Sequence, residues 1–205
     1  MELQGTVLPG YRVMEYLLML PPPDQLEEKI RNLRAAFDAE FKPAHKIPGR
    51  PNVGLAQWMQ YKMMEQRTLD RLRVVAMGYF PFKIELRDFG SYPSHSIHVN
   101  MVSKLPVQQL IKKIREDAGS IMRLNKDNKP HFLTEPHITI ARKLVPWQYE
   151  KAWLEYSQKH FRGSFIADAM LLLKRAQGQR SWQIAERLNF QNLPIHIEAK
   201  QGELF

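Results

Sequence analysis

The sequence contains no cysteine, which excludes a disulfide framework, a thiol nucleophile and a thiolate metal site. It also lacks a long hydrophobic run, because the longest one, Tyr16 to Pro23, is far too short to span a bilayer. The first residues show neither a basic region nor a small-residue cleavage site, so we expect no signal peptide. Together these absences predict a cytoplasmic protein without a membrane partner, and they indicate nothing about protein partners.

The seven histidines do not form a metal-binding pattern. No two of them have the i, i+4 spacing, and none stands beside a carboxylate at ligand spacing. We therefore expect no metal site and no cofactor.

The composition is that of a globular protein with a basic surface. Hydrophobic residues make up 44% and charged residues 25% of 205 residues, enough for one large domain or two small lobes with a real core. The formal net charge of +9 favours an anionic partner, nucleic acid first. A basic surface without a binding role is the alternative interpretation.

Apolar periodicity predicts alternating strands and helices. Strands are expected over residues 13–20, 52–58, 80–89, 95–102, 135–144, 165–174 and 181–190. Helices are expected over 24–41, 61–76 and 146–160, with a fourth that begins at Pro106. Asp24 and Glu27 form a predicted N-cap and capping box for the first helix. Residues 175–180 are a hairpin candidate, and 193–199 a candidate edge strand.

The order of these elements contains a repeat. Residues 51–56 align without a gap on residues 136–141, at an offset of 85 (136 − 51). The preceding helices keep nearly this offset, because Pro22 and Pro106 are 84 residues apart (106 − 22). The pattern predicts an internal duplication, with a first repeat over about 13–78 and a second over about 95–161. The whole chain, 1–205, is then a single domain with two lobes.

The stretch from Glu135 to Leu144 carries the clearest candidate for chemistry. Its polar and apolar residues alternate, so a strand would place His137 and Thr139 on one face and the intervening isoleucines on the other. An imidazole beside a hydroxyl on a rigid strand can hold and protonate a phosphate. A half-buried strand that merely exposes these two residues is the alternative, since short motifs match often by chance.

The Pro-His-Ile-Thr-Ile-Ala-Arg run at 136–142 and the Leu-x-Leu-Pro-Pro start at 18–22 resemble the 2′-5′ RNA ligase-like family of two-histidine phosphoesterases. The resemblance covers most of the chain, from Val13 to about Phe190. It implies an α+β bilobal fold that arose by duplication, with two antiparallel sheets flanking a cleft and helices on the outer faces. It also implies a metal-independent reaction at 2′,3′-cyclic phosphates or 2′-5′ linkages of RNA or nucleotides.

In that family each lobe contributes a His-x-Thr/Ser motif, so that one histidine accepts a proton and the other donates one. His137 and Thr139 match the second motif and are the predicted catalytic residues. The first motif is replaced by Asn52 and Gly54. Asparagine cannot act as an acid or base near pH 7, and glycine has no hydroxyl. Loss of one proton-transfer group typically costs about 10²- to 10⁴-fold in rate.

A replacement histidine could restore the second proton transfer. His98 shares a predicted strand face with Asn100, opposite an apolar face, and is therefore the third catalytic candidate. A hydrogen-bonded structural histidine is the alternative. Asn52, Asn100, Arg50 and Arg142 are the candidate substrate-binding residues, although strand parity could turn Arg142 to the other face.

Two functions remain open from the sequence. One is a phosphodiesterase or RNA ligase-like enzyme acting on RNA or nucleotide phosphodiesters with one intact motif. The other is a catalytically silent relative that binds RNA or nucleotide phosphates. A scaffold in which His137 is only a remnant is more distant.

Overall fold

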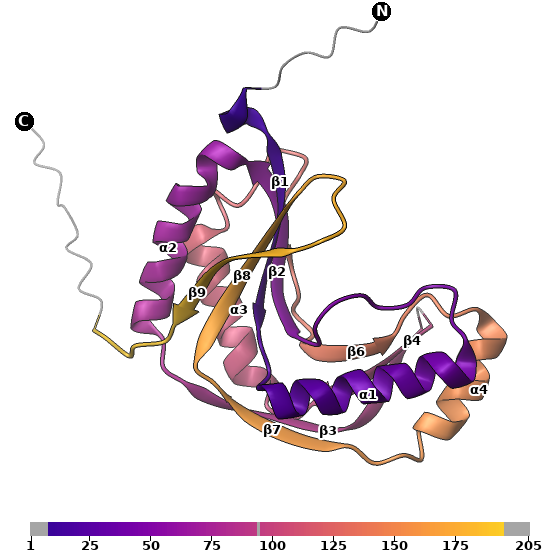
Figure 1. The fold of residues 1–205 in the computed structure, drawn as a ribbon. Coiled ribbons are helices and arrows are strands. Elements are labelled where there is room, and N and C mark those ends of the chain that lie inside the picture. The colour runs from indigo at the N-terminus through magenta and orange to yellow at the C-terminus, as the bar shows by residue number, and fades with distance from the viewer. Residues whose placement is uncertain (1–7, 94, 195–205) are drawn as a thin grey trace, which may run out of the picture.

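The computed structural model describes residues 8–93 and 95–194, which form two antiparallel sheets (Figure 1). The strands are β1 (Val13–Leu20), β2 (Val53–Tyr61), β3 (Phe82–Tyr92), β4 (Ser96–Met101), β5 (His131–Phe132), β6 (His137–Ala141), β7 (Arg162–Ala167), β8 (Ala169–Ala176) and β9 (Gln183–Asn189). One sheet has five strands in the order β5-β2-β1-β8-β9, and the other has four in the order β6-β4-β3-β7.

Four α-helices and two short 3-10 turns complete the described part of the chain. They are η1 (Pro9–Tyr11), α1 (Asp24–Phe41), η2 (Lys62–Met64), α2 (Glu65–Gly78), α3 (Lys104–Ala118) and α4 (Pro146–Tyr156). The predicted α+β fold with two antiparallel sheets and outer helices is confirmed.

β1 lies at the centre of the five-stranded sheet, which explains its nearly continuous apolar sequence. Tyr16, Leu18 and Leu20 are buried in the core. The strand ends at Leu20 because Pro21, the first of three prolines, has no N–H to donate to a strand ladder.

α1 begins at Asp24, the residue that the sequence predicted as the N-cap of this helix. Pro23 is the N-cap and Asp24 is the first helical residue, so the predicted capping role of Asp24 is wrong. Its carboxylate still lies in the first turn, where the helix dipole favours negative charge. The helix ends at Phe41, and Lys42 follows in the left-handed conformation, with its N–H bonded to the Asp38 carbonyl.

The predicted strand over 165–174 is two strands in different sheets. β7 pairs with β3, and β8, after the single residue Asp168, pairs with β1 and β9. Figure 1 shows β7 leading directly into β8, so this connection carries the chain from one sheet to the other. Both segments are largely apolar, and an apolar run in the sequence does not reveal a change of sheet.

The first helix of each predicted repeat packs on a strand of the other repeat. α1 follows β1 of the five-stranded sheet and contacts β6 of the other sheet. α3 follows β4 of the four-stranded sheet and contacts β2 of the first. α2 packs on α3, and α4 on β4. Each sheet is therefore covered partly by a helix from the other half of the chain.

The two strand pairs β1–β2 and β4–β6 share an irregularity at corresponding positions. In the first pair the register shifts between Leu18 and Met19, which skips Leu55 on the partner strand. In the second it shifts between Ile97 and His98, which skips Ile140. Leu55 and Ile140 are separated by 85 residues (140 − 55), the offset found in the sequence. The duplication itself stays a prediction. A bulge at the same offset in both strand pairs agrees with it.

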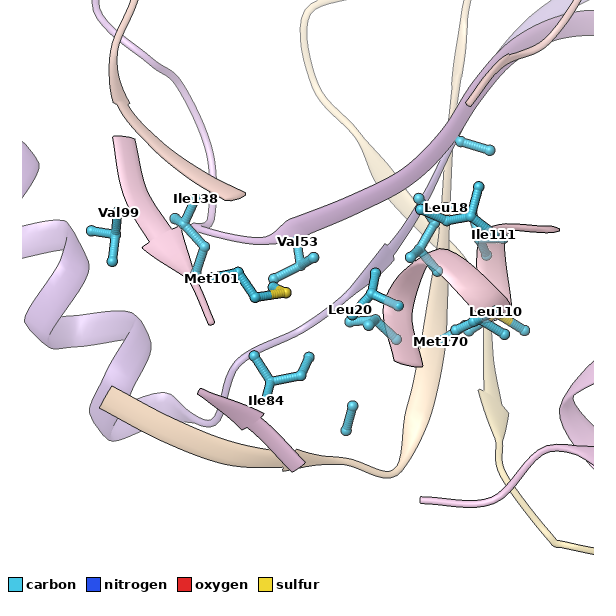
Figure 2. Close-up of a cluster of buried hydrophobic side chains, with 14 of the residues drawn as sticks. Leu18, Leu20, Val53, Ile84, Val99, Met101, Leu110, Ile111, Ile138 and Met170 are labelled. Carbon is cyan, nitrogen blue, oxygen red and sulfur yellow. The ribbon is translucent and has the colours of Figure 1, made fainter. Parts of the chain in front are cut away.

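One hydrophobic cluster joins the two sheets and the helices that cover them. Figure 2 shows Leu18 and Val53 of the five-stranded sheet, Ile84 and Ile138 of the other, and Leu110 of α3 within this cluster. All five side chains have no exposed surface. Truncating such a residue to alanine typically costs about 2–5 kcal/mol. The core therefore holds the two sheets in a fixed relation to each other.

The remaining predicted elements are present with shifted ends, apart from the last one. The hairpin candidate near 175–180 is confirmed by the antiparallel pairing of β8 with β9. β5, only two residues long, was not predicted. The candidate edge strand over 193–199 lies mostly outside the described residues, and Leu193 and Pro194 are not in a strand.

Candidate functional site

A cavity of about 290 Å³ lies between β1 and β2 on one side and β6 on the other. α1, the loop before β2, and the segments around residues 133 and 182 complete its walls. Polar and charged side chains share its lining with apolar ones: Leu17, Arg34, Ile47, Pro48, Asn52, Gly54, Gln57, Leu133, Glu135, Pro136, His137, Thr139, Arg142, Arg175 and Trp182. The cavity therefore brings His137 and Thr139 together with Asn52 and Gly54, the residues that the sequence predicted as the two motif positions.

His137 and Thr139 project from β6 into this cavity, as the two-residue strand period predicts. The Nδ1 atom of His137 lies 2.7 Å from the backbone carbonyl oxygen of Glu135. A carbonyl can only accept, so the neutral ring carries its hydrogen on Nδ1 and leaves the Nε2 lone pair free. Burial lowers the pKa of His137, as does Lys104, while the Glu135 carbonyl raises it. The imidazole is therefore a proton acceptor at neutral pH.

His98 lies directly beside His137 but is covered. In the β4–β6 ladder His98 pairs with Thr139, and the two imidazole rings are 4.7 Å apart. The Tyr92 ring stacks on His98 at 4.5 Å, and the Tyr92 hydroxyl lies 3.4 Å from His137 Nδ1. Only 5% of His98 is exposed, and it is not part of the cavity wall.

The covered position of His98 changes its acid–base behaviour. Burial, and then the charge of His137, lowers the pKa of His98 to about 4. A hydrogen bond with the Asn100 side chain opposes this shift but is smaller. Among the described residues no hydrogen-bond partner reaches its Nδ1 atom. His98 is therefore neutral at pH 7.

Asn100 and His98 lie over Gly90 of β3, which explains why a glycine is required there. A Cβ atom built on Gly90 would lie 2.7 Å from His98 Nε2 and still closer to the Asn100 side-chain oxygen. Asn100 pairs with His137 across the ladder but does not line the cavity. The structure therefore places Asn100 behind the candidate site, next to His98.

The half of the site that β2 contributes has no acid or base. Asn52 precedes β2 and lines the cavity, but its side-chain amide donates to the Arg50 carbonyl at 2.9 Å. A Cβ on Gly54 would lie 3.1 Å from a methyl carbon of Leu133. A side chain at position 54 would therefore require the Leu133 side chain to move by a few tenths of an ångström.

Three guanidinium groups line the cavity. Arg34 of α1 is 9% exposed and donates from Nε and Nη2 to the Thr139 carbonyl at 3.0 and 2.8 Å, and from Nη1 to Gly49 at 3.4 Å. Arg142 lies just past the end of β6 at Ala141, so strand parity no longer dictates its direction and it reaches the cavity. Arg175 donates to Glu15 at 2.7 Å and stacks on Trp182, 4.4 Å from the ring.

Arg50, a predicted substrate-binding residue, is placed elsewhere. Its guanidinium donates to the carboxylate of Glu27, which is only 3% exposed, at 3.0 Å and lies 3.6 Å from Asp24. It lines a separate cavity beside the three prolines and does not line the cavity of His137. The reason is that the buried Glu27 carboxylate requires a cation, and Arg50 supplies it.

Sequence reasoning missed Arg34, Tyr92 and Leu133. Arg34 left a signal, because it falls four residues after Ile30 and three before Phe37, within the buried stripe of α1. A charged residue in an apolar stripe requires a partner or a function. Tyr92 and Leu133 gave no comparable signal, since aromatic and aliphatic residues are ordinary in strands and core.

Neither a metal-binding cluster nor a membrane-spanning helix is found in the described part of the chain. Within residues 8–93 and 95–194, no three His, Cys, Asp or Glu side chains gather as a metal-binding group. None of the helices in those ranges is both long and apolar enough to cross a bilayer. The cytoplasmic location stays a prediction.

Comparison with known proteins defines the class to which this fold and site belong. The profile of the 2′-5′ RNA ligase superfamily matches residues 21–179, more than three quarters of the chain. The chain is therefore a member of the 2′-5′ RNA ligase superfamily, as its motif predicted.

Individual relatives share a quarter or less of their residues with this chain. A Geobacillus kaustophilus (strain HTA426) protein, whose name places it among phosphoesterases, is 24% identical over 176 residues, covering 84% of this chain and 94% of that protein. The crystal structure of E. coli LigT with 3′-AMP gives a TM-score of 0.62 at 16% identity, covering 87% of this chain and 98% of LigT. The TT0787 protein of Thermus thermophilus gives 0.62 at 15% identity, covering 86% and 98%. These structures show that the fold is shared.

Proposed function

We propose that the protein is a phosphoesterase that acts on nucleotides or RNA ends, with His137 as its proton-transfer group. The observation that carries this proposal is that His137, whose Nδ1 lies 2.7 Å from the Glu135 carbonyl oxygen, lines a cavity together with Thr139 and three arginines. The volume of about 290 Å³ suits a nucleotide fragment. Complexes of E. coli LigT with 3′-AMP and with ATP support a nucleotide ligand.

The cavity wall supplies a proton acceptor and groups that can hold a phosphate. His137 Nε2 accepts the proton of an attacking water or hydroxyl, and the Thr139 hydroxyl donates to a non-bridging phosphoryl oxygen. Arg142 and the two N–H groups of Arg34 outside its three hydrogen bonds compensate the phosphate charge. Asn52 would turn its amide from Arg50 to the ligand. We propose 2′,3′-cyclic and 2′-5′ phosphodiesters as the first compounds to test.

The other predicted residues take supporting roles in this proposal. His98 and Asn100 hold Tyr92 and His137 in place from behind, instead of contacting the phosphate. The second proton is left to water, because His98 is buried and neutral. Arg50 stabilises Glu27 and has no contact with the ligand.

Turnover assays test the proposal directly. The purified protein, with chelator present, should hydrolyse at least one of uridine 2′,3′-cyclic phosphate, a 2′-5′-linked diadenosine and the 4-nitrophenyl ester of uridine 5′-phosphate. His137→Ala should reduce this rate by about 10²- to 10⁴-fold, the usual share of a positioned acid–base group. His160→Ala is the matched control, because this histidine is 87% exposed and lies outside the cavity wall, and it should keep the rate. Full activity in His137→Ala would remove this residue from the mechanism.

A catalytically silent binder is the second candidate, and one observation favours it. Asn52 and Gly54 stand where the family has histidine and threonine, and a methyl carbon of Leu133 lies 3.1 Å from the place of a Cβ on Gly54. Salt-sensitive binding of oligonucleotides without turnover of any of the three compounds would support this alternative.

A further inference from the structure

The loss of the first motif restricts which bond the site can break. In phosphoryl transfer the attacking and leaving oxygens lie roughly in line, on opposite sides of the phosphorus. One imidazole nitrogen cannot reach both oxygens at once. A single histidine therefore acts either on the nucleophile or on the leaving group.

His137 acts on the nucleophile in this arrangement. Its Nδ1 hydrogen is held by the Glu135 carbonyl at 2.7 Å, which leaves Nε2 as a proton acceptor. No other imidazole lines the cavity within the described residues. His98 has the nearest imidazole ring, 4.7 Å away, and it is 5% exposed, under Tyr92 on the same sheet as His137. It does not reach the side where a leaving group would depart.

The part of the wall around Asn52, Gly54 and Leu133 offers no proton donor for the leaving group. Asn52 is not acidic, Gly54 has no side chain, and Leu133 is apolar. Apart from His137, the ionisable side chains that line the cavity within the described residues are three arginines, which are guanidinium cations, and Glu135, which pairs with Lys104 at 3.2 Å. A sugar alkoxide, which must be protonated as it departs, is therefore a poor leaving group here.

The charges of the cavity favour a different leaving group. Arg34, Arg142 and Arg175 face one carboxylate within the wall, and Arg175 has a carboxylate partner of its own, Glu15. Guanidinium groups bind phosphate oxygens in pairs and stabilise negative charge as it develops. A phosphate departs as a stable anion and needs no proton.

We propose that the preferred substrates are nucleotide phosphoanhydrides, in which the leaving group is itself a phosphate. This inference rests on the proposed function, because it uses the same nucleotide site and the same proton acceptor, but the bond that breaks is an anhydride instead of an ester. Water attacks one phosphorus and forms a P–O bond, while His137 Nε2 takes its proton. The bond from that phosphorus to the bridging oxygen breaks, and the electron pair leaves with that oxygen as a phosphate anion held by the arginines. The imidazolium then releases its proton to solvent.

Leaving-group dependence tests this proposal. The probes are diadenosine 5′,5′-pyrophosphate, the 4-nitrophenyl and phenyl esters of uridine 5′-phosphate, and uridine 2′,3′-cyclic phosphate. Phenol has a pKa of about 10, as tyrosine does, whereas 4-nitrophenolate leaves without a proton. We expect the pyrophosphate and the 4-nitrophenyl ester to react about 10² or more times faster than the phenyl ester and the cyclic phosphate, the factor that a missing general acid accounts for.

The outcomes separate this inference from the proposed function. Similar rates for the two aryl esters, or fastest turnover of the cyclic phosphate, would overturn the inference and leave the proposed function intact. Failure to turn over any of the four compounds would overturn the inference, and failure to turn over the 2′-5′-linked diadenosine as well would overturn both. Rates that survive His137→Ala would also overturn both, because another group would then accept the proton.

A variant that restores the missing half gives an independent check. Asn52→His with Gly54→Thr supplies a second histidine and hydroxyl, and Leu133→Ala provides the space that threonine needs. Compared with Leu133→Ala alone, this triple variant should raise turnover of the cyclic phosphate by about tenfold or more and flatten the leaving-group dependence. An unchanged dependence in a folded triple variant would count against the missing acid as its cause.

Discussion

Arg34 provides the sharpest test of how the site is held together. The Arg34→Ala substitution leaves the Thr139 carbonyl without its two guanidinium donors, at 3.0 and 2.8 Å, and removes a weaker bond to Gly49. A hydrogen bond from a charged group contributes about 1.5–3 kcal/mol, and the lost packing of the side-chain stem adds about 1 kcal/mol. Burying the cation opposes this gain, because burial lowers the pKa of Arg34 to about 10. We expect a net loss of about 2–3 kcal/mol in the free energy of unfolding.

Urea denaturation followed by circular dichroism measures this loss, and thermal unfolding should show a midpoint lower by roughly 4–12 °C for a chain of this size. Arg31→Ala is the matched control on the same helix. Its side chain is 57% exposed, and its ion pair with Glu27 is long, at 3.7 Å. Its loss should therefore cost about 0.5 kcal/mol or less. Arg34→Lys keeps the charge without the forked geometry and should fall between the two. Equal stability of Arg34→Ala and Arg31→Ala would refute the reasoning.

Three further predictions concern the residues packed behind the cavity wall, namely Gly90, Tyr92, His98 and Asn100. Because burial lowers the pKa of His98 from 6.5 to about 4, the unfolded chain binds a proton that the folded chain refuses, so stability should fall as pH drops from about 6.5 to about 4. His98→Gln should flatten that slope in urea titrations at stepped pH, and an unchanged slope would contradict the assignment. Gly90→Ala should cost about 1–3 kcal/mol in the same assay, since its Cβ would meet His98 and Asn100, whereas Gly10→Ala, with 3.5 Å of clearance, should be nearly neutral. Tyr92→Ala should expose His98 and raise its pKa in NMR titrations, whereas Tyr92→Phe, which keeps the stacked ring, should not; equal pKa values in both variants would contradict this cause.

The local sequence pattern predicted where most helices and strands lie, but it did not predict which strands pair with each other. The strand at 137–141 followed from alternation, and the helix at 24–41 from its apolar stripe and the three prolines before it. The division of 165–174 into two strands did not follow, because Phe165 and Leu172 are equally apolar and become buried in different sheets. The partner of a strand depends on contacts that no short window contains.

For this protein the sequence by itself determined the family, and it fixed which residues stand at the two predicted motif positions, His137 with Thr139 and Asn52 with Gly54. These are statements about which side chains exist, and they need no coordinates. Only the tertiary structure decided what surrounds that motif. Arg34 binds a carbonyl 105 residues away, and Leu133 closes the space beside Gly54. Such positions are set by packing between segments distant in sequence, so only the folded chain can place them.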